Sequence, residues 1–474
     1  MKALLFTALV ALALPVQAQK APMTENPTPP VAAKKPHSYT RHGYTISDEY
    51  FWMKDQSYPK IDDAEILDHL KAENAYFEAM MAPRAALVET IFQEMKGRIK
   101  EDESSVPQKD GRYLYWRRFE KGAQYKQWLR KPVAGGPETV ILDEARLAEG
   151  KEYFRLGGIA ISEDDRFMAY STDEDGSERY TIRIRDLQGG ADLPVAIPGT
   201  LGSFAWSRDG KHLVYGLVNE SWRVDTIKLH TIGSDPAQDR ILYREPDQGF
   251  QASVGMTQSR AWIVIATGDN ETSEVRLLPA DNPLAQPMLV RARKKGIEYD
   301  VEEHDGTLFI HTNEDSTQFS LKTAPLSDPG NWTTRIAADP DFYMTGVTTF
   351  AGFFVVEGRE RGLDQIEVHS YSGGPGKRIP FPEASYTASL DENPEYDVSK
   401  LRIAYESMVT PDTVSEYDVK TGKAAVLKVQ EIPSGYDPSN YVTERVEITA
   451  RDGTRVPVSV VYRKGFRKDG NGPL

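Results

Sequence analysis

Hydrophobic and polar residues follow a helical period in the first part of this chain. The stretches 62–81 and 83–99 carry apolar residues three or four positions apart, which is typical of amphipathic helices. In the second stretch, Leu87, Ile91 and Met95 recur every fourth residue. Each helix would bury a single apolar stripe, so both require a partner surface.

From about residue 104 the period changes to two, and turn residues separate short alternating runs. A turn followed by an alternating apolar strand recurs seven times, at spacings of about 45 to 55 residues. Four short strands per repeat at this period are typical of a propeller blade. The pattern therefore predicts a mainly β fold, with a seven-bladed β-propeller over residues 104–435. The repeats begin at Asp110, Asp164, Asp209, Ser259, Asp305, Ala351 and Ser399.

The repeat "FAWSRDGKHLVYG", residues 204–216, shows the pattern most clearly. Asp209-Gly210 supplies a hairpin turn, and the alternation places Leu213 and Tyr215 on one face of the second strand and Val214 on the other. A sandwich of irregular strands is the alternative, and seven matches at near-constant spacing argue against it.

Length, charge and composition narrow the class of protein. A chain of 474 residues is too long for one ordinary core, so several modules are expected. The formal charge of -14 argues against a nucleic-acid partner, and the mean hydropathy of -0.51 argues against an integral membrane protein. There are no cysteines, which excludes disulfides, thiolate nucleophiles and iron–sulfur clusters.

The N-terminus resembles a secretory signal. A basic start precedes the apolar run 3–14, which is too short to span a bilayer, and Ala18 is the small residue that signal peptidase requires. We expect a cleaved signal peptide at 1–18 and a secreted or periplasmic protein that begins at Gln19. An uncleaved anchor is the alternative. Residues 19–36 are proline-rich and polar, and should form a flexible linker.

Motifs that carry chemistry are scarce. The sequence contains no Gly-x-Ser-x-Gly, no His-Glu-x-x-His and no P-loop. Asp173, Asp175 and Gly176 resemble part of a calcium loop, but Ile182 stands where the closing glutamate belongs, so we expect a solvated hairpin turn. The sequence predicts no metal site and no cofactor.

Two acidic segments, 100–104 and 390–397, could pair as acid and base. Nothing in their spacing requires this, and we interpret both as solvated turns. His304 and His311 are close in sequence, but Asp305-Gly306 turns the chain between them. A structural role is expected for both histidines.

The order of these segments resembles the prolyl oligopeptidase family of serine peptidases, and oligopeptidase B most of all. The likeness covers nearly the whole mature chain. It rests on the segment 29–55, with His42-Gly43 and the Trp52 and Asp55 pair, on the first helix at 67–81, on the blade at 156–187, and on the closing stretch "ITARDGTRVPVSVVYRKGFRKDGNGPL" at 448–474.

The resemblance implies that different parts of the chain belong to different domains. In this family a propeller is inserted near the start of an α/β-hydrolase domain, which supplies the serine, aspartate and histidine in that order. Residues 37–103 would then be a helical segment that packs on the hydrolase domain, and 436–474 would be the first strands of that domain. The catalytic triad is expected beyond Leu474, so the chain alone should be inactive.

The activity implied is that of a secreted serine oligopeptidase, which hydrolyses short peptides after Lys or Arg. The acidic balance agrees with cationic peptide substrates. Cleavage after proline is one alternative, and a non-catalytic propeller that binds a peptide or a partner is another.

Two candidate site residues follow from the resemblance alone. Arg179, in "SERY", is a candidate for an interdomain salt bridge. Gln124, in "GAQY", stands where similar chains commonly carry an acidic residue, and this departure puts recognition of basic side chains at that point in doubt. The alternative is that both are ordinary blade residues.

Overall fold

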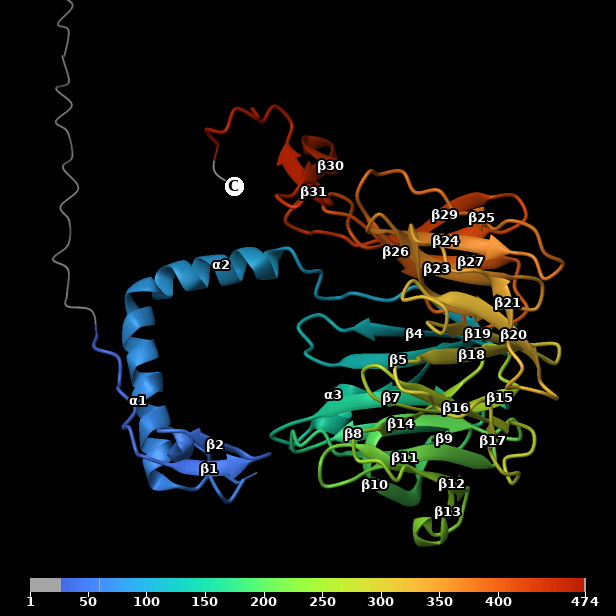
Figure 1. Ribbon diagram of the computed structural model, residues 1–474, viewed down its shortest axis with the longest axis horizontal. Coiled ribbons are helices and arrows are strands. Elements are labelled where there is room, and N and C mark those ends of the chain that lie inside the picture. Colours follow the sequence, from blue (N-terminus) through green and yellow to red (C-terminus); the bar gives the residue numbers. More distant parts are fainter. Residues whose placement is uncertain (1–26, 59, 473–474) are drawn as a thin grey trace, which may run out of the picture. The chain divides into compact units, whose positions relative to one another are not determined.

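The computed structural model describes residues 27–58 and 60–472. The predicted signal peptide at 1–18 lies outside these residues, as does the first part of the predicted linker. The chain divides into two compact units between Arg98 and Ile99 (Figure 1). Within the described residues, no helix combines the length and apolar character needed to cross a membrane.

The N-terminal unit contains a small hairpin and two helices, as the helical period predicts. The first helix begins where the Asp63 carboxylate accepts hydrogen bonds from the backbone N–H groups of Glu65 (2.9 Å) and Ile66 (3.3 Å). Both predicted helices are confirmed. The elements are β1 (Ser38–Arg41), β2 (Tyr44–Ser47), η1 (Phe51–Met53), α1 (Ala64–Met81), η2 (Ala82–Arg84) and α2 (Ala85–Gly97).

Asp55 fixes the segment that leads into α1. Its carboxylate accepts hydrogen bonds from the Ser57 hydroxyl (2.6 Å) and from the backbone N–H groups of Asp62 and Asp63 (2.9 Å each). The bonds from Ser57 and Asp63 hold the pKa of Asp55 well below its usual range. Trp52 donates to the Ala33 carbonyl at 2.7 Å. The Trp52 and Asp55 pair therefore shapes the backbone locally.

Both helices display apolar side chains to solvent. Phe77 of α1 and Leu87, Phe92 and Met95 of α2 are each more than half exposed, and α2 buries none of its residues. Exposed apolar side chains that share a helix face are typical of a surface that interacts with another apolar surface.

The C-terminal unit is built from antiparallel sheets of consecutive strands. Five of them have four strands, and a sixth has seven (Figure 1). The five blades are β3 (Gln108–Asp110), β4 (Tyr113–Phe119), β5 (Lys126–Pro132) and β6 (Thr139–Asp143); β14 (Gln251–Met256), β15 (Trp262–Gly268), β16 (Ser273–Pro279) and β17 (Met288–Leu289); β18 (Tyr299–His304), β19 (Thr307–Thr312), β20 (Ser320–Pro325) and β21 (Thr333–Ile336); β22 (Phe342–Thr349), β23 (Phe354–Glu360), β24 (Leu363–His369) and β25 (Lys377–Arg378); β26 (Thr387–Leu390), β27 (Lys400–Glu406), β28 (Thr413–Asp418) and β29 (Lys423–Val429).

The prediction of seven separate blades is wrong. The described residues form five four-stranded blades, and the stretch expected to form two more is one continuous seven-stranded sheet. Short helices flank this sheet: α3 (Glu144–Ala148) precedes it, and η3 (Pro236–Gln238) precedes its last strand. Its strands are β7 (Arg155–Ile161), β8 (Phe167–Asp173), β9 (Tyr180–Asp186), β10 (Ala191–Trp206), β11 (His212–Val218), β12 (Val224–Thr231) and β13 (Arg240–Arg244).

The long strand β10 is the reason for this fusion. Its first part pairs with β9 and its last part with β11, and Thr200 pairs with both Tyr180 and Leu217. Gly199 and Gly202 adopt φ values of 72° and 85° and accompany register shifts, so the strand bends without ending. The two glycines look like turn signals in the sequence, but they act here as bulges.

The faces predicted for the second strand of the 204–216 repeat are confirmed. Leu213 and Tyr215 join one buried apolar cluster, and Val214 joins another on the opposite face. A propeller strand is buried on both faces because its sheet packs between two neighbours. The turn at Asp305-Gly306 has positive φ at both residues (48° and 74°), as a tight hairpin requires.

Apolar clusters join each sheet to the next along the chain. Six such clusters lie in the described residues, and none of them joins the first blade, β3–β6, to the last, β26–β29. We call this junction between the first and last blades the seam. A cavity of about 360 Å³ lies in the seam, lined by both blades.

A two-stranded hairpin follows the last blade. It consists of β30 (Tyr441–Thr449) and β31 (Arg455–Arg463), with η4 (Pro438–Asn440) before it. Polar groups fix it to the propeller: the Ser385 hydroxyl donates to the Ser459 hydroxyl at 2.6 Å, and Arg361 forms an ion pair with Glu447 at 3.3 Å.

Candidate functional site

A central cavity of about 600 Å³ is a candidate site in the C-terminal unit. It lies between the first blade, the seven-stranded sheet, the β14–β17 blade and the segment that follows β26. Tyr115, Trp128, Phe204 and Trp206 contribute aromatic surface to its lining. Polar and charged side chains also line it, among them Asp110, Glu163 and Arg260. A cavity of this volume with mixed walls suits a small ligand or a short peptide.

An ion pair lies at one end of this cavity. The Arg260 guanidinium donates to both oxygens of Asp110, at 2.8 and 2.9 Å, and joins the β14–β15 turn to the first blade. Burial acts to lower the pKa of Arg260, but the hydrogen bond and charge of Asp110 outweigh it and raise that pKa. Because Asp110 holds both arms of the guanidinium, the cation is a structural tie at this end of the cavity.

Glu302 lies close to this ion pair in the ring. Its carboxylate accepts hydrogen bonds from the Gln258 backbone N–H (2.8 Å) and the Thr349 hydroxyl (3.2 Å), which come from the two neighbouring blades. Burial raises the pKa of Glu302 to about 8. The group is therefore largely protonated at neutral pH.

The acidic segments interpreted as solvated turns lie at the seam. Glu103, in segment 100–104, forms an ion pair with Lys428 of the last blade. Glu395, in segment 390–397, forms one with Lys109 of the first blade at 2.5 Å. Each carboxylate is about one-third exposed or less, so the interpretation as solvated turns does not hold for Glu103 and Glu395. Asp102 and Glu392, in the same two segments, are exposed. Their partners lie about 290 to 330 residues away in the sequence, and no local signal identifies them.

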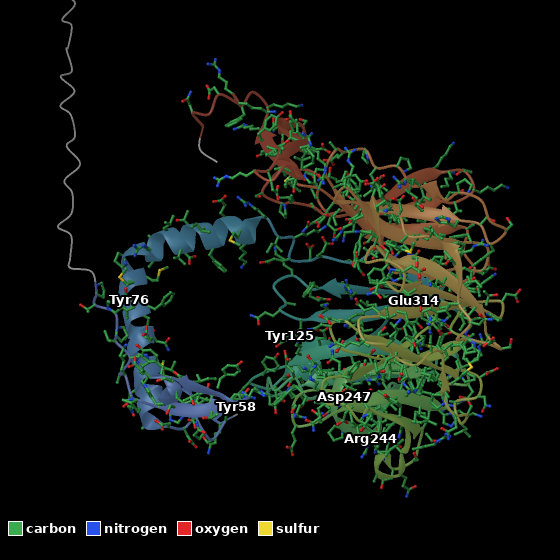
Figure 2. All side chains as sticks on the ribbon, in the orientation of Figure 1. Tyr58, Tyr76, Tyr125, Arg244, Asp247 and Glu314 are labelled. Carbon is green, nitrogen blue, oxygen red and sulfur yellow. The ribbon has the colours of Figure 1, made fainter. Side chains whose placement is uncertain are left out.

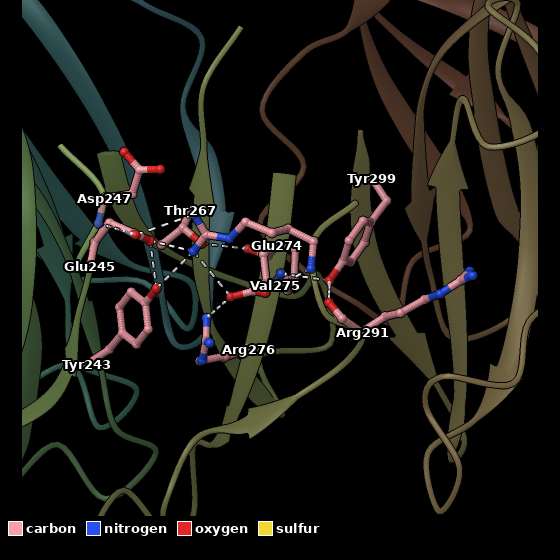
Figure 3. Close-up of polar contacts among 10 residues, drawn as sticks. Tyr243, Glu245, Asp247, Thr267, Glu274, Val275, Arg276, Arg291 and Tyr299 are labelled. Atoms are coloured by element: carbon pink, nitrogen blue, oxygen red, sulfur yellow. Dashed lines mark hydrogen bonds and ion pairs between the residues drawn. The ribbon is translucent and has the colours of Figure 1, made fainter. Parts of the chain in front are cut away.

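A further cluster of buried charges joins the seven-stranded sheet to the β14–β17 blade (Figure 3). Arg293 contacts Glu245 at 2.5 Å, Glu274 at 3.4 Å and the Tyr243 hydroxyl at 3.2 Å. Arg276 pairs with Glu274 at 2.7 Å. Burial opposes the charge of Arg293, but its hydrogen bonds to the two glutamates raise its pKa. Two arginines thus balance two glutamates, and the cluster is structural.

Arg179 lies in the turn between β8 and β9. Its guanidinium donates to the Asn219 carbonyl at 2.9 Å and stacks over the Trp222 ring at 4.4 Å. The Trp222 indole in turn donates to the Ser177 carbonyl at 2.8 Å. These contacts join two loops of the seven-stranded sheet, and an interdomain salt bridge at Arg179 stays a prediction.

Gln124 is exposed in the turn between β4 and β5. Tyr125, the next residue, is labelled in Figure 2. Its ring packs edge-on against Phe154, with ring centroids 5.6 Å apart. Arg179 and Gln124 belong to different sheets, and neither lines the central cavity. Their part in substrate recognition also stays a prediction.

The calcium-like loop is held by its own backbone. The buried Asp173 carboxylate accepts from the N–H groups of Asp175 (3.1 Å), Gly176 (3.0 Å) and Glu178 (2.9 Å). The two histidines also have structural partners: His304 stacks on Tyr371 at 3.6 Å, and His311 pairs with the Asp300 carboxylate.

These sheets and the cavity between them define a β-propeller. Residues 29–430 match the family described as prolyl oligopeptidase, N-terminal β-propeller domain. The chain belongs to this family, which confirms the resemblance in the sequence.

Two relatives align with most of this chain. It is 35% identical to dipeptidyl aminopeptidase BI of Pseudoxanthomonas mexicana, over 99% of this chain and 67% of the relative. It is 32% identical to protease 2 of Moraxella lacunata, over 94% of this chain and 65% of the relative. The chain thus spans about two thirds of the length of these relatives.

Solved structures of oligopeptidase B are similar to this chain. The enzyme from Leishmania major superposes with a TM-score of 0.86 at 30% identity, over 93% of this chain and 66% of that one. The closed form from Trypanosoma brucei, with covalently bound antipain, gives 0.86 at 32% identity over the same shares.

Proposed function

We propose that this chain is the propeller-containing portion of a serine oligopeptidase that hydrolyses short peptides after Lys or Arg. The observation that carries the proposal is the TM-score of 0.86 with oligopeptidase B at 30% identity or more, over 93% of the chain. The catalytic serine, histidine and aspartate would belong to the third of the relatives' length that these 474 residues do not span. There the histidine would activate the serine, and the aspartate would orient the histidine.

The propeller would contribute size selection. Its central cavity has room for an extended peptide segment but not for a folded domain. The fourth strand of a blade runs opposite to the first, so the chain leaves the ring at the end opposite the turns that follow the inner strands. A hydrolase domain that continues from the β30–β31 hairpin would therefore cover that exit end.

The preference for basic residues is supported by charge. The chain carries 71 acidic against 57 basic side chains, which raises the local concentration of cationic peptides around it. The solved structures named oligopeptidase B match at 30% and 32% identity, whereas the prolyl endopeptidases match at only 24% identity or less.

A comparison of two proteins tests the activity. The complete reading frame that contains this sequence should react with a fluorophosphonate probe and cleave amide substrates with Arg or Lys before the scissile bond faster than those with Pro. The purified 474-residue chain should do neither. Faster cleavage after Pro would favour the prolyl-specific alternative, and a complete frame without probe labelling would favour a non-catalytic binding module.

The N-terminal helices would pack on the hydrolase domain. Their exposed apolar faces support this assignment, and the 474-residue chain should therefore bind a hydrophobic dye. The complete protein should bind less dye. Equal dye binding by the two proteins would argue against the assignment.

The protein would be secreted or periplasmic after cleavage near Ala18. The basic start and the apolar run 3–14 support this placement. N-terminal sequencing of the protein from its native source should begin at Gln19, and a mature protein that retains Met1 would contradict the assignment.

A further inference from the structure

The segment Glu392–Tyr396, which follows β26, leaves its own sheet. It contacts each of the four remaining four-stranded blades. It corresponds to most of the acidic segment 390–397. Its partners lie in the first blade, in the β14–β15 turn, at the end of β18 and in the β22–β23 turn. The partner residues are Gln108, Lys109, Gly111, Gln258, His304 and Ala351.

Three bonds tie this segment across the seam to the first blade. The Glu395 carboxylate accepts from the Lys109 ammonium at 2.5 Å and from the Gly111 backbone N–H at 2.7 Å. The Gln108 side-chain amide donates to the Glu392 carbonyl. Glu395 is 24% exposed, so its ion pair is partly shielded from solvent.

On the other side, the segment is tied to three blades. The Gln258 amide donates to the Asn393 carbonyl at 2.5 Å. The Tyr396 hydroxyl bonds to the His304 ring at 2.5 Å, and the Ala351 backbone N–H donates to the Tyr396 carbonyl at 3.0 Å. Bonds from one short segment to four blades hold it across the ring.

The same segment forms a wall of the central cavity, which Glu392, Asn393 and Pro394 line. All its partner residues belong to inner strands or to the turns that follow them. Inner strands of successive blades run in the same direction around a ring, so these turns gather at one end. The segment therefore crosses the cavity at that end.

We propose that Glu392–Tyr396 is a polar strap that closes the ring at the seam and also closes one end of the central cavity to large molecules. The seam has no apolar cluster among the described residues, so polar bonds must hold the first blade to the last. Release of the strap would free the first blade and widen that end. This proposal concerns the propeller alone and does not depend on the peptidase activity.

A cysteine reporter tests the proposal, since the natural chain has no cysteine. Ser253 lies on the exposed face of β14, the same face as Gly255, which lines the cavity. Ser253→Cys would report on the cavity. Ser327→Cys, in the exposed turn between β20 and β21, would report on the outside. Each is labelled in the full chain with N-ethylmaleimide and with a bulky polyethylene-glycol maleimide.

Glu395→Gln removes the charge that Lys109 and Gly111 contact and keeps the shape of the side chain. We expect the bulky reagent to label the cavity cysteine at least about threefold faster in this variant, with the outside cysteine unchanged. Amide exchange at Gly111 and Ala351 should accelerate in parallel. The matched control is Glu416→Gln, which removes an equal charge from the exposed Lys400 pair (3.0 Å) of the same blade and should change neither rate.

Two results would overturn the proposal. Faster exchange at Gly111 with unchanged bulky labelling would show that the segment ties the ring but does not close the cavity. Unchanged amide exchange and unchanged labelling would show that the Glu395 carboxylate does not hold the strap to the first blade. If Glu395→Gln fails to fold, labelling of the two cysteine reporters without this substitution is compared at low salt and at 1 M salt. At 1 M salt the Debye length is about 3 Å, which weakens the Glu395 ion pair. The bulky reagent should then label the cavity cysteine faster, with the outside cysteine unchanged.

Discussion

The two junctions on either side of the last blade, β26–β29, are built from opposite kinds of side chain. The junction with β22–β25 is an apolar cluster that includes Phe350, Val355, Leu401 and Tyr405, all buried. The seam with β3–β6 is held by ion pairs and by bonds to backbone carbonyls, such as that from Arg402 to the Pro107 carbonyl at 2.8 Å.

The two junctions are therefore expected to differ in how strongly they hold neighbouring blades together and in how readily they open. Apolar burial contributes about 25 cal/mol per Å², is not screened by salt, and is lost only when the surfaces part. Partly exposed ion pairs contribute about 0–1 kcal/mol each and weaken with salt. The ring is therefore expected to open first at the seam, and the other junctions should stay closed until global unfolding.

Breaking the apolar junction should have the largest effect. Leu401→Ala removes a fully buried side chain from its cluster, and it should lower the free energy of unfolding by about 2–5 kcal/mol. Denaturant unfolding followed by tryptophan fluorescence measures this. Leu427→Ala, at an exposed position of β29, is the control and should cost less than about 1 kcal/mol. Equal losses of stability in the two variants would mean that the apolar junction does not contribute most of the ring's stability.

Glu302 is a buried polar group at the apolar junctions of its blade, and its ionisation should make stability depend on pH. Its carboxyl keeps its proton up to about pH 8 in the folded protein, whereas the unfolded chain releases it near 4.5. The folded state therefore binds more protons between these values, and stability falls as the pH rises through them.

Glu302→Gln should remove this part of the pH dependence. The variant should match the natural chain near pH 4 and exceed it at pH 9 by about 1–3 kcal/mol. Unfolding midpoints measured across that range provide the test. Parallel pH profiles for the two proteins would show that Glu302 ionises normally.

Breaking one ion pair at the seam should have the smallest effect on global stability. Lys428→Met keeps most of the apolar stem but loses the charge opposite Glu103, and it should cost about 1 kcal/mol. Amide exchange of residues 103–106 should accelerate more than that of the β22–β25 blade. Lys400→Met, which breaks an exposed pair on the same blade, serves as the comparison. Uniform acceleration around the ring would contradict the distinction between the junctions.

Local patterns predict most of the secondary structure. The helical period locates α1 and α2, and Asp-Gly turns with alternating strands locate the hairpins, because both depend on neighbours in sequence. The separation into seven blades fails at β10, where Gly199 and Gly202 signal a turn but form bulges. Only the pairing on both edges of the strand distinguishes the two outcomes.

The candidate site is much less visible in the sequence. Glu103 and Glu395 stand in acidic segments that resemble solvated turns, and their partners are close only after the ring has closed. The raised pKa of Glu302 likewise depends on burial of its carboxyl by other blades. Arg179 and Gln124, chosen by resemblance, lie away from the central cavity.

The unbroken strand β10 also limits how this protein can change over time. At other boundaries between repeats, a loop can lengthen or shorten without disturbing its neighbours. Within Ala191–Trp206 the gain or loss of one residue would reverse the side-chain faces beyond it. Engineered permutants and exchanged repeats should therefore tolerate cuts elsewhere in the ring, and recombination should treat residues 155–244 as a single indivisible block.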